Sequence, residues 1–325
     1  MDPQKHNLFD MMDKEMQKVL EIQNKRLENA FLTDTSIESM RKAYNEERAY
    51  WNDDEPEMAN IQDIDYIGPH GKIKLRVYQP FTAKTPLQQD IILFLHGGGF
   101  VVGNCNTHDK IMRILADLGQ CLVIGVEYHL APECTFPIQI EECAEVLYDI
   151  MHQNWKFPFT CAGPIHVCGD SAGAHLAMVS YLYLKNKAVQ CERIKTLILY
   201  YGYFGLKDSI SRRLFGSELD GMRKEDLEFY EKIYLGNITE SNALYKQYID
   251  LFNQPFPNDM ANVFLGACEL DPLLDDSKLM YELLKDNTTC ELAIYPGTLH
   301  GFLHYSSEMV LAKKALQHGI HFALR

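Results

Sequence analysis

The stretch Ile165-His166-Val167-Cys168-Gly169-Asp170-Ser171-Ala172-Gly173 decides the fold of this 325-residue chain. A strand-like apolar run leads directly into the pattern Gly-x-Ser-x-Gly, and a helical pattern begins at once. In such a strand–turn–helix elbow the residues two before and two after the serine come into close contact, so both must lack side chains, while the serine is held strained and exposed. Ser171 is therefore predicted as a nucleophile supported by Gly169 and Gly173. The alternative is a chance match in a glycine-containing loop.

A second glycine-rich run points to the same chemistry. His96-Gly97-Gly98-Gly99-Phe100 follows the apolar segment 91–95. Residues without side chains let backbone N–H groups approach a developing oxyanion. The alternatives are a flexible loop and a phosphate-binding loop. A phosphate-binding loop would have Lys-Ser or Lys-Thr after the glycines, or the spacing Gly-x-Gly-x-x-Gly, and neither pattern is present here. We predict an oxyanion hole completed by the N–H of Ala172, in a loop that His96 shapes by side-chain hydrogen bonding.

The acid and the base should follow the serine along the chain, in that order. Asp271, held by Pro272, comes directly after the predicted strand 263–267. It lies at the edge of an open α/β sheet where ligands bind, so we predict Asp271 as the acid. Asp275 and Asp276 are its rivals, but they stand where the next helix starts, where carboxylates face the helix dipole.

The predicted base is His300, in the glycine-flanked loop after the strand 291–295. Loop histidines are more often functional than packed. His304, four residues on, is expected to cap or pack, and His175 on the elbow helix is expected to be a buried, hydrogen-bonded histidine.

Around these motifs, short apolar runs alternate with helical patterns. This rhythm, with runs that are apolar throughout, predicts an α/β fold with a mainly parallel sheet covered by helices on both faces. The period-two pattern from Ile73 to Val77 adds an outer or edge strand with one wet face. The expected order is strand 91–95, helix 107–118, strand 121–126, helix 138–152, strand 165–168, helix 173–186, strand 196–201, strand 263–267, helix 276–285, strand 291–295 and helix 306–323.

Two regions break the rhythm. Helical spacing over 8–30 and a second helix after the capping box Thr35-Ser36-Ile37-Glu38 precede any strand. About sixty residues separate strands 196–201 and 263–267, far more than one connection needs. We therefore expect one domain over 1–325, with a helical cap made from 1–55 and 203–260.

Composition excludes several classes. Lys and Arg total 31 against 45 Asp and Glu, so the net charge of −14 disfavours nucleic acid and anionic lipid. The apolar runs are far shorter than the roughly 20 residues of a membrane span. A polar N-terminus without a signal-peptide pattern indicates a cytoplasmic protein. The nine cysteines include no Cys-x-x-Cys pair, which argues against a disulfide framework or a zinc ribbon.

The motifs together resemble the hormone-sensitive-lipase-like branch of the α/β-hydrolase esterases. The markers are His96-Gly97-Gly98-Gly99, Gly169-Asp170-Ser171-Ala172-Gly173, Asp271-Pro272-Leu273 and His300-Gly301-Phe302. The stretches 107–113, 271–277 and 295–300 are similar to the enterobacterial acetyl esterases, and the likeness covers nearly the whole chain. One departure is Tyr128-His129-Leu130-Ala131-Pro132-Glu133, in which His129 replaces the branch's arginine and puts a local ion pair in doubt.

This resemblance implies a serine carboxylesterase that hydrolyses small short-chain acyl esters, acetyl to butyryl, with no metal or cofactor. Ser171, His300 and Asp271 would form the triad, and the N–H groups of Gly98, Gly99 and Ala172 would bind the oxyanion. A homodimer would be ordinary for the branch. A regulatory partner is implied more weakly, because enterobacterial relatives are linked to restraint of a maltose-system activator and an α-galactosidase. The alternatives are an amidase or peptidase on the same triad, and a pocket-binding regulatory protein with secondary esterase activity.

Overall fold

The computed structural model describes residues 8–26, 31–33, 35–82, 89–153, 162–253 and 255–325. The strands in these ranges are β1 Asn60–Gly68, β2 Gly71–Gln79, β3 Ile91–Leu95, β4 Leu122–Glu127, β5 Ile165–Asp170, β6 Ile194–Tyr200, β7 Asn262–Cys268 and β8 Cys290–Tyr295. They form one eight-stranded sheet in the order β1-β2-β4-β3-β5-β6-β7-β8. In this order, neighbouring strands from β4 to β8 run parallel, whereas the pairs β1–β2 and β2–β4 are antiparallel. The expected α/β class with a mainly parallel sheet is confirmed.

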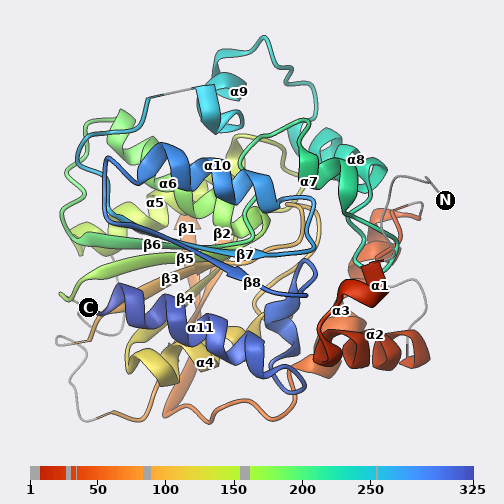
Figure 1. The fold of residues 1–325 in the computed structure, drawn as a ribbon. Coiled ribbons are helices and arrows are strands. Elements are labelled where there is room, and N and C mark those ends of the chain that lie inside the picture. Colours follow the sequence, from red (N-terminus) through yellow and green to blue (C-terminus); the bar gives the residue numbers. More distant parts are fainter. Residues whose placement is uncertain (1–7, 27–30, 34, 83–88, 154–161, 254) are drawn as a thin grey trace.

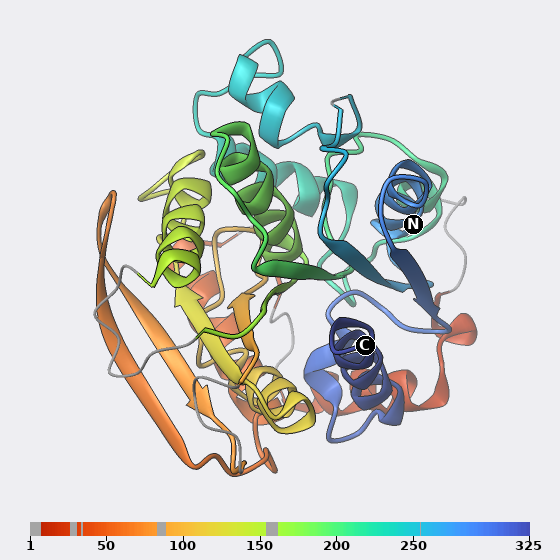
Figure 2. The ribbon, with the colours of Figure 1, turned by 90° about the vertical axis from the view of Figure 1, so that its left-hand side faces the viewer.

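Helices cover both faces of this sheet (Figures 1 and 2). One face carries α4 (Asp109–Gly119) and α11 (Val310–Ala323), and the other carries α5 (Ile138–His152), α6 (Ala172–Asn186) and α10 (Leu274–Leu284). These helices match the predicted ones, except that the pattern from 306 begins as α11 only at Val310, after the short 3-10 helix η3 (Phe302–Tyr305).

The two helical layers explain why the parallel strands are apolar throughout. In β3, Ile91, Leu93 and Leu95 belong to one buried cluster, whereas Ile92 and Phe94 belong to the cluster on the opposite face. Successive side chains of a strand point to opposite faces, so a strand between two helical layers needs apolar residues at every position.

The outer strands differ from the prediction. β2 contains the predicted 73–77 strand, but it is second from the edge, because the unpredicted β1 pairs with it along its full length. Most positions of β1 are exposed or half-buried. Its sequence therefore lacks the apolar run or regular alternation that marks a strand.

The N-terminal pattern forms three helices, α1 (Leu8–Met11), α2 (Lys14–Arg26) and α3 (Ile37–Trp51). The expected single helix over 8–30 is interrupted at Asp13, whose Oδ1 accepts the N–H of Glu15, and positions 27–30 lie outside the described residues, as do residues 1–7. The predicted capping box is wrong by one residue. Ser36, not Thr35, is the N-cap of α3, and its side chain accepts the N–H of Ser39.

The segment 203–260 contains α7 (Ile210–Leu214), α8 (Lys224–Leu235) and α9 (Ala243–Tyr248). α8 packs against α3, with Tyr44 and Tyr230 in one apolar cluster. α9 packs instead against α6, where the rings of Tyr183 and Tyr248 lie 5.7 Å apart. Figure 1 shows α1, α2, α3, α7 and α8 gathered at one end of the sheet. The single domain and the exact extent of the cap stay predictions.

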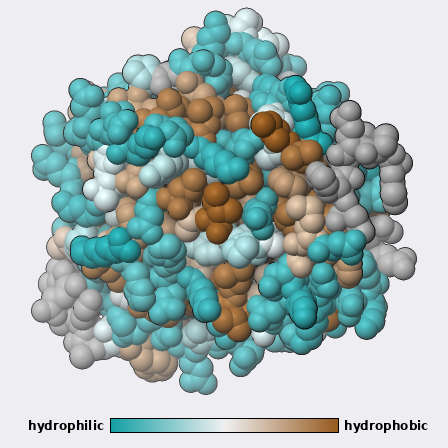
Figure 3. Space-filling model, in the orientation of Figure 1, coloured by the Kyte–Doolittle hydropathy of each residue, from teal (hydrophilic) through white to brown (hydrophobic). Residues whose placement is uncertain are grey.

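One surface is notably apolar. Figure 3 shows apolar side chains gathered over the region of α10 and β8, and Leu279, Leu283 and Ile294 from these elements remain more than a third exposed. β8 is also an edge strand. Such an edge is typical of contact surfaces, and the homodimer stays a prediction. Within the described residues, no helix has the length and apolar character needed to cross a bilayer.

Candidate active site

The elbow places Ser171 between β5 and α6. Its φ of 55° lies in the left-handed region, which a residue with a side chain adopts only under strain. A Cβ on Gly169 would lie 2.3 Å from the carbonyl oxygen of Gly173, and a Cβ on Gly173 would lie 1.9 Å from the carbonyl oxygen of Leu95. The close approach inferred from the sequence is therefore present, and only glycine fits at both positions.

The structure brings Ser171, His300 and Asp271 together from three strand ends. Ser171 Oγ lies 2.8 Å from Nε2 of His300. Nδ1 of the same ring lies 2.7 Å from Oδ2 of Asp271. The other carboxylate oxygen, Oδ1, accepts the N–H of Leu273 at 2.8 Å, which fixes the orientation of the acid. This chain of contacts is the arrangement of a nucleophile, a base and the group that orients the base.

The charges around His300 favour a strong base. Burial would lower the pKa of His300, but the charge of Asp271 and the hydrogen bond to it outweigh burial and raise the pKa above its usual value. Asp220 and Asp170 add smaller contributions in the same direction. The imidazolium that forms when His300 takes a proton is therefore stabilised.

The predicted oxyanion donors lie beside the elbow. Gly98 and Gly99 have φ values of 117° and 58°, which side chains rarely adopt. Their loop follows β3, whose last residue, Leu95, pairs with Gly169 of β5. Ala172 is the first residue of α6, and no side chain caps the N-terminus of this helix. Helix N-termini carry N–H groups without an intrahelical partner, which suits them to bind a negative oxygen.

Two residues of the segment 203–260, Tyr230 and Asp220, lie close to this site. Tyr230 of α8 packs directly on the glycine loop, since a Cβ on Gly99 would lie 2.4 Å from its Cδ1. In the loop before α8, Asp220 Oδ1 accepts N–H groups of Ser217 and Met222, while Oδ2 is buried without a hydrogen bond. Burial and then the charge of Asp271 raise the pKa of Asp220 to about 6. Neither Tyr230 nor Asp220 stands in a sequence motif.

The two rival acids have another task. Both lie in the first turn of α10, as expected, but neither caps the helix. Asp276 Oδ1 accepts the N–H of Phe204, and Oδ2 lies 3.3 Å from the guanidinium of Arg212. Asp275 Oδ2 accepts the N–H of Ser211. Through these carboxylates, the start of α10, directly after the loop of Asp271, binds the chain at Phe204 and around α7.

Three other histidines singled out in the sequence, His96, His175 and His304, are buried and make no contact in the chain from Ser171 to Asp271. His175 Nδ1 lies 3.0 Å from the carbonyl oxygen of Tyr203, and burial lowers the pKa of His175 to about 4. His304 packs edge-on against His108, and burial lowers its pKa as well. His96 Nδ1 lies 2.8 Å from the carbonyl oxygen of Gly97, so the ring contacts its own loop as expected.

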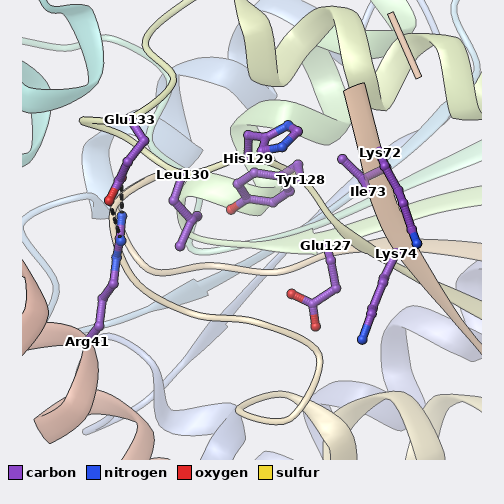
Figure 4. Close-up of a pocket in the computed structure, with 9 residues that line it drawn as sticks. All are labelled: Arg41, Lys72, Ile73, Lys74, Glu127, Tyr128, His129, Leu130 and Glu133. Atoms are coloured by element: carbon purple, nitrogen blue, oxygen red, sulfur yellow. Dashed lines mark hydrogen bonds and ion pairs between the residues drawn. The ribbon is translucent and has the colours of Figure 1, made fainter. Parts of the chain in front are cut away.

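In the segment 128–133, the side chain of His129 contacts a carboxylate. His129 Nδ1 lies 2.5 Å from Oε1 of Glu142, which is fully buried. A cavity of about 430 Å³ opens beside this segment, with Lys72 and Lys74 of β2 on one side (Figure 4). On the other side, Arg41 of α3 forms a bidentate pair with Glu133.

One group in the described part of the chain has the chemistry of a metal site. His108, Asp170 and His304 are buried and place one ligand atom each within 4.8 Å of one another. Within it, His108 Nε2 lies 3.2 Å from Asp170 Oδ1. In the sequence, His108 falls only within the stretch 107–113 that carries the resemblance. No spacing rule connects it with Asp170, which lies on a different strand–helix unit.

Comparison with known proteins places this geometry in context. The model of a family described as alpha/beta hydrolase fold matches residues 92–304. Acetyl esterases of Salmonella schwarzengrund and Salmonella typhi are 41% identical over 290 residues, which cover 89% of this chain and 87% of theirs. The resemblance drawn from the motifs is confirmed by these relatives.

Solved structures agree with the fold. An ester hydrolase from the metagenome of Lake Arreo is 25% identical with a TM-score of 0.86, covering 96% of this chain and 98% of that one. A thermostable carboxylesterase from a metagenomic library is 26% identical with a TM-score of 0.79, covering 89% of this chain and 97% of that one.

Proposed function

The chain belongs to the alpha/beta hydrolase fold family and is a carboxylic ester hydrolase, and from this premise we propose that it hydrolyses short-chain acyl esters through an acyl-enzyme on Ser171. The observation that carries the proposal is the unbroken chain of contacts from Ser171 Oγ through His300 to Asp271, at 2.8 and 2.7 Å. The acetyl esterases at 41% identity support an acetyl-sized acyl group.

The proposed mechanism has two steps. In the first step, His300 Nε2 takes the hydroxyl proton while Ser171 Oγ attacks the ester carbonyl. The carbonyl oxygen becomes negative and is met by the N–H groups of Gly98, Gly99 and Ala172. His300 then gives its proton to the leaving alcohol, and the acyl group remains on Ser171. In the second step His300 takes a proton from a water that attacks the acyl carbon, and gives this proton to Ser171 Oγ as the bond between Oγ and the acyl group breaks and the acid leaves.

Asp271 acts through His300. Its Oδ2 contact with Nδ1 holds the imidazole in the tautomer whose Nε2 can accept the serine proton, and its charge stabilises the imidazolium. In this scheme Ser171 needs no metal ion to become a nucleophile, because His300 takes its proton.

The short acyl preference is supported by the cover over the oxyanion loop. Tyr230 packs on Gly99, and its helix α8 is packed in turn against α3. A ring in that position leaves little room for an acyl chain that would extend past the glycine loop. Each methylene contributes about 0.8 kcal/mol only where it can be buried, so methylenes beyond the space that the Tyr230 ring leaves should add no binding energy.

The test is a set of initial rates on p-nitrophenyl esters of increasing acyl length, beside the p-nitroanilide of the best acyl group. We expect rates that fall beyond medium chains and a strong preference for the ester over the anilide. A preference for the anilide would instead support an amidase on the same triad. Efficient hydrolysis of emulsified long-chain triglyceride would contradict the short-chain proposal.

A further inference from the structure

A buried carboxylate lies directly behind the nucleophile. Asp170 ends β5 and precedes Ser171, and only 3% of its surface is exposed. Its partner comes from a different part of the chain: His108, fully buried at the start of α4, places Nε2 3.2 Å from Asp170 Oδ1. Neither side chain contacts the reacting atoms in the proposed mechanism. A buried charge that has no role would be costly, so the pair needs an explanation.

The same carboxylate holds the oxyanion loop. Asp170 Oδ1 accepts the N–H of Gly97 at 2.8 Å. The fit is tight, because a Cβ on Gly97 would lie 2.6 Å from Asp170 Oδ2. Gly97 leads directly into Gly98 and Gly99, whose N–H groups we assign to the oxyanion. Asp170 therefore joins the end of the strand that carries the nucleophile to the loop that carries two of the donors.

His108 keeps this carboxylate charged and in place. Burial would raise the pKa of Asp170, but the interaction with His108 and the N–H of Gly97 outweigh burial and lower it. The imidazole is itself fixed at its other nitrogen, because Nδ1 lies 2.9 Å from Thr107 Oγ1. An ionised acceptor makes the stronger hydrogen bond to the Gly97 N–H. The orientation of the loop is thus determined before substrate arrives, as preorganised stabilisation requires.

We propose that His108 is a positioning residue for ester hydrolysis: it holds the Asp170 carboxylate against the Gly97 N–H and so aims the oxyanion donors of Gly98 and Gly99. This inference rests on the proposed esterase function. A competing use of the same side chains is metal binding with His304. His108 Nε2 lies at ion-pair distance, 3.2 Å, from Asp170 Oδ1 but makes no hydrogen bond to it, and what favours the positioning role is the hydrogen bond from the Gly97 N–H to the same carboxylate oxygen.

Three variants and one control test the proposal. His108→Leu removes the contact with Asp170, His108→Gln keeps an N–H donor of similar reach, and Asp170→Asn removes the charge. The matched control is His166→Leu, because His166 is also a buried histidine but stands at the start of β5, at the other end from Asp170. Circular dichroism and thermal melting establish that each variant is folded.

We expect His108→Leu and Asp170→Asn to lower kcat about 10- to 100-fold on p-nitrophenyl acetate, somewhat less than the loss of a whole oxyanion donor, with KM nearly unchanged. His108→Gln should recover most of the loss, and His166→Leu should retain the wild-type kcat. A trifluoromethyl ketone, which forms a tetrahedral oxyanion with the serine, should bind more weakly by the factor lost in kcat/KM. A general loss of packing would not produce this match.

Other results would overturn the proposal. Full kcat in His108→Leu, or a rise in KM with unchanged kcat, would show that the pair does not act on the oxyanion. If His108→Leu does not fold, Asp170→Asn decides by the same two readouts. Activity that EDTA abolishes and Zn²⁺ restores in the wild type would make the cluster a metal site. A separate measurement tests the proposed function itself. If the wild type hydrolyses the ester and Ser171→Ala does not, the proposed function stands in each of these cases. If the wild type shows no such activity, the proposed function is contradicted.

Discussion

Tyr230 of α8 lies so close to Gly99 that a Cβ on this glycine would come within 2.4 Å of the tyrosine ring. One residue belongs to the segment inserted between β6 and β7, and the other belongs to the loop that carries the proposed oxyanion donors. The contact joins the part of the chain that we propose to limit the substrate to the part that we propose to stabilise the transition state.

Removal of the Tyr230 ring should therefore extend the range of acyl chains. In Tyr230→Ala we expect kcat/KM for hexanoyl relative to acetyl esters to rise by up to about fourfold for each methylene that the new space buries. Phe229→Ala is the matched control, since it removes the neighbouring ring of the same helix. An unchanged hexanoyl-to-acetyl ratio in Tyr230→Ala would exclude this ring as the limit on acyl length.

The pH dependence of kcat/KM should have its acid limb above the ordinary histidine value of about 6.5. His300 must be neutral to accept the serine proton, and its pKa is raised, so activity is lost as the pH falls through that raised value. Asp220→Asn removes one of the charges that raise this pKa, so its acid limb should move to lower pH. Glu225→Gln, an exposed carboxylate of α8, should leave the limb in place. A limb that stays fixed in Asp220→Asn would contradict this electrostatic account.

The ion pair between Asp276 and Arg212 should matter for stability more than for chemistry. Asp276→Ala leaves a guanidinium and the N–H of Phe204 without their buried acceptor, and we expect a loss of about 3–5 kcal/mol in the free energy of unfolding. Asp275→Asn should cost less than about 1.5 kcal/mol, because the side chain is partly exposed and the amide keeps an acceptor for Ser211. Urea unfolding measures both. Equal losses in the two variants would contradict the distinction.

Substitution of each predicted triad member should lower kcat strongly. Ser171→Ala and His300→Ala should each lower kcat by about 10⁴- to 10⁶-fold, and the double variant should be no worse, since the residues act as a unit. Asp271→Asn favours the wrong imidazole tautomer and should lose about 10⁴-fold while remaining folded. If Asp271→Asn stayed active while Asp275→Asn was silent, the choice of acid would be wrong.

Much of the fold and the triad could be predicted because each feature had a local signal. Strands such as β3 are buried on both faces and read as unbroken apolar runs. The elbow, Asp271 and His300 lie in short motifs directly after strands. The edge strand β1 carried no such signal, because its side chains are mostly in contact with water.

Contacts between distant segments were beyond the reach of the sequence. Asp276 was expected to face a helix dipole, yet its partners Phe204 and Arg212 come from another segment that only the fold brings near. His108 and Asp170 meet for the same reason. The role of a buried polar residue depends on the partner that it contacts, and a single sequence does not indicate which distant residue that partner is.

The central claim is that Ser171 carries the acyl group, and rapid-quench mass spectrometry with p-nitrophenyl acetate tests it most directly. We expect the mass of one acetyl group on the peptide that contains Ser171. This acetyl group should form in a burst that matches the release of p-nitrophenol. In an Asp271→Asn variant whose deacylation slows more than its acylation, more of the acetylated peptide should accumulate. The same peptide should stay unmodified in Ser171→Ala. An acetyl group on another residue, or full turnover by Ser171→Ala, would contradict the account.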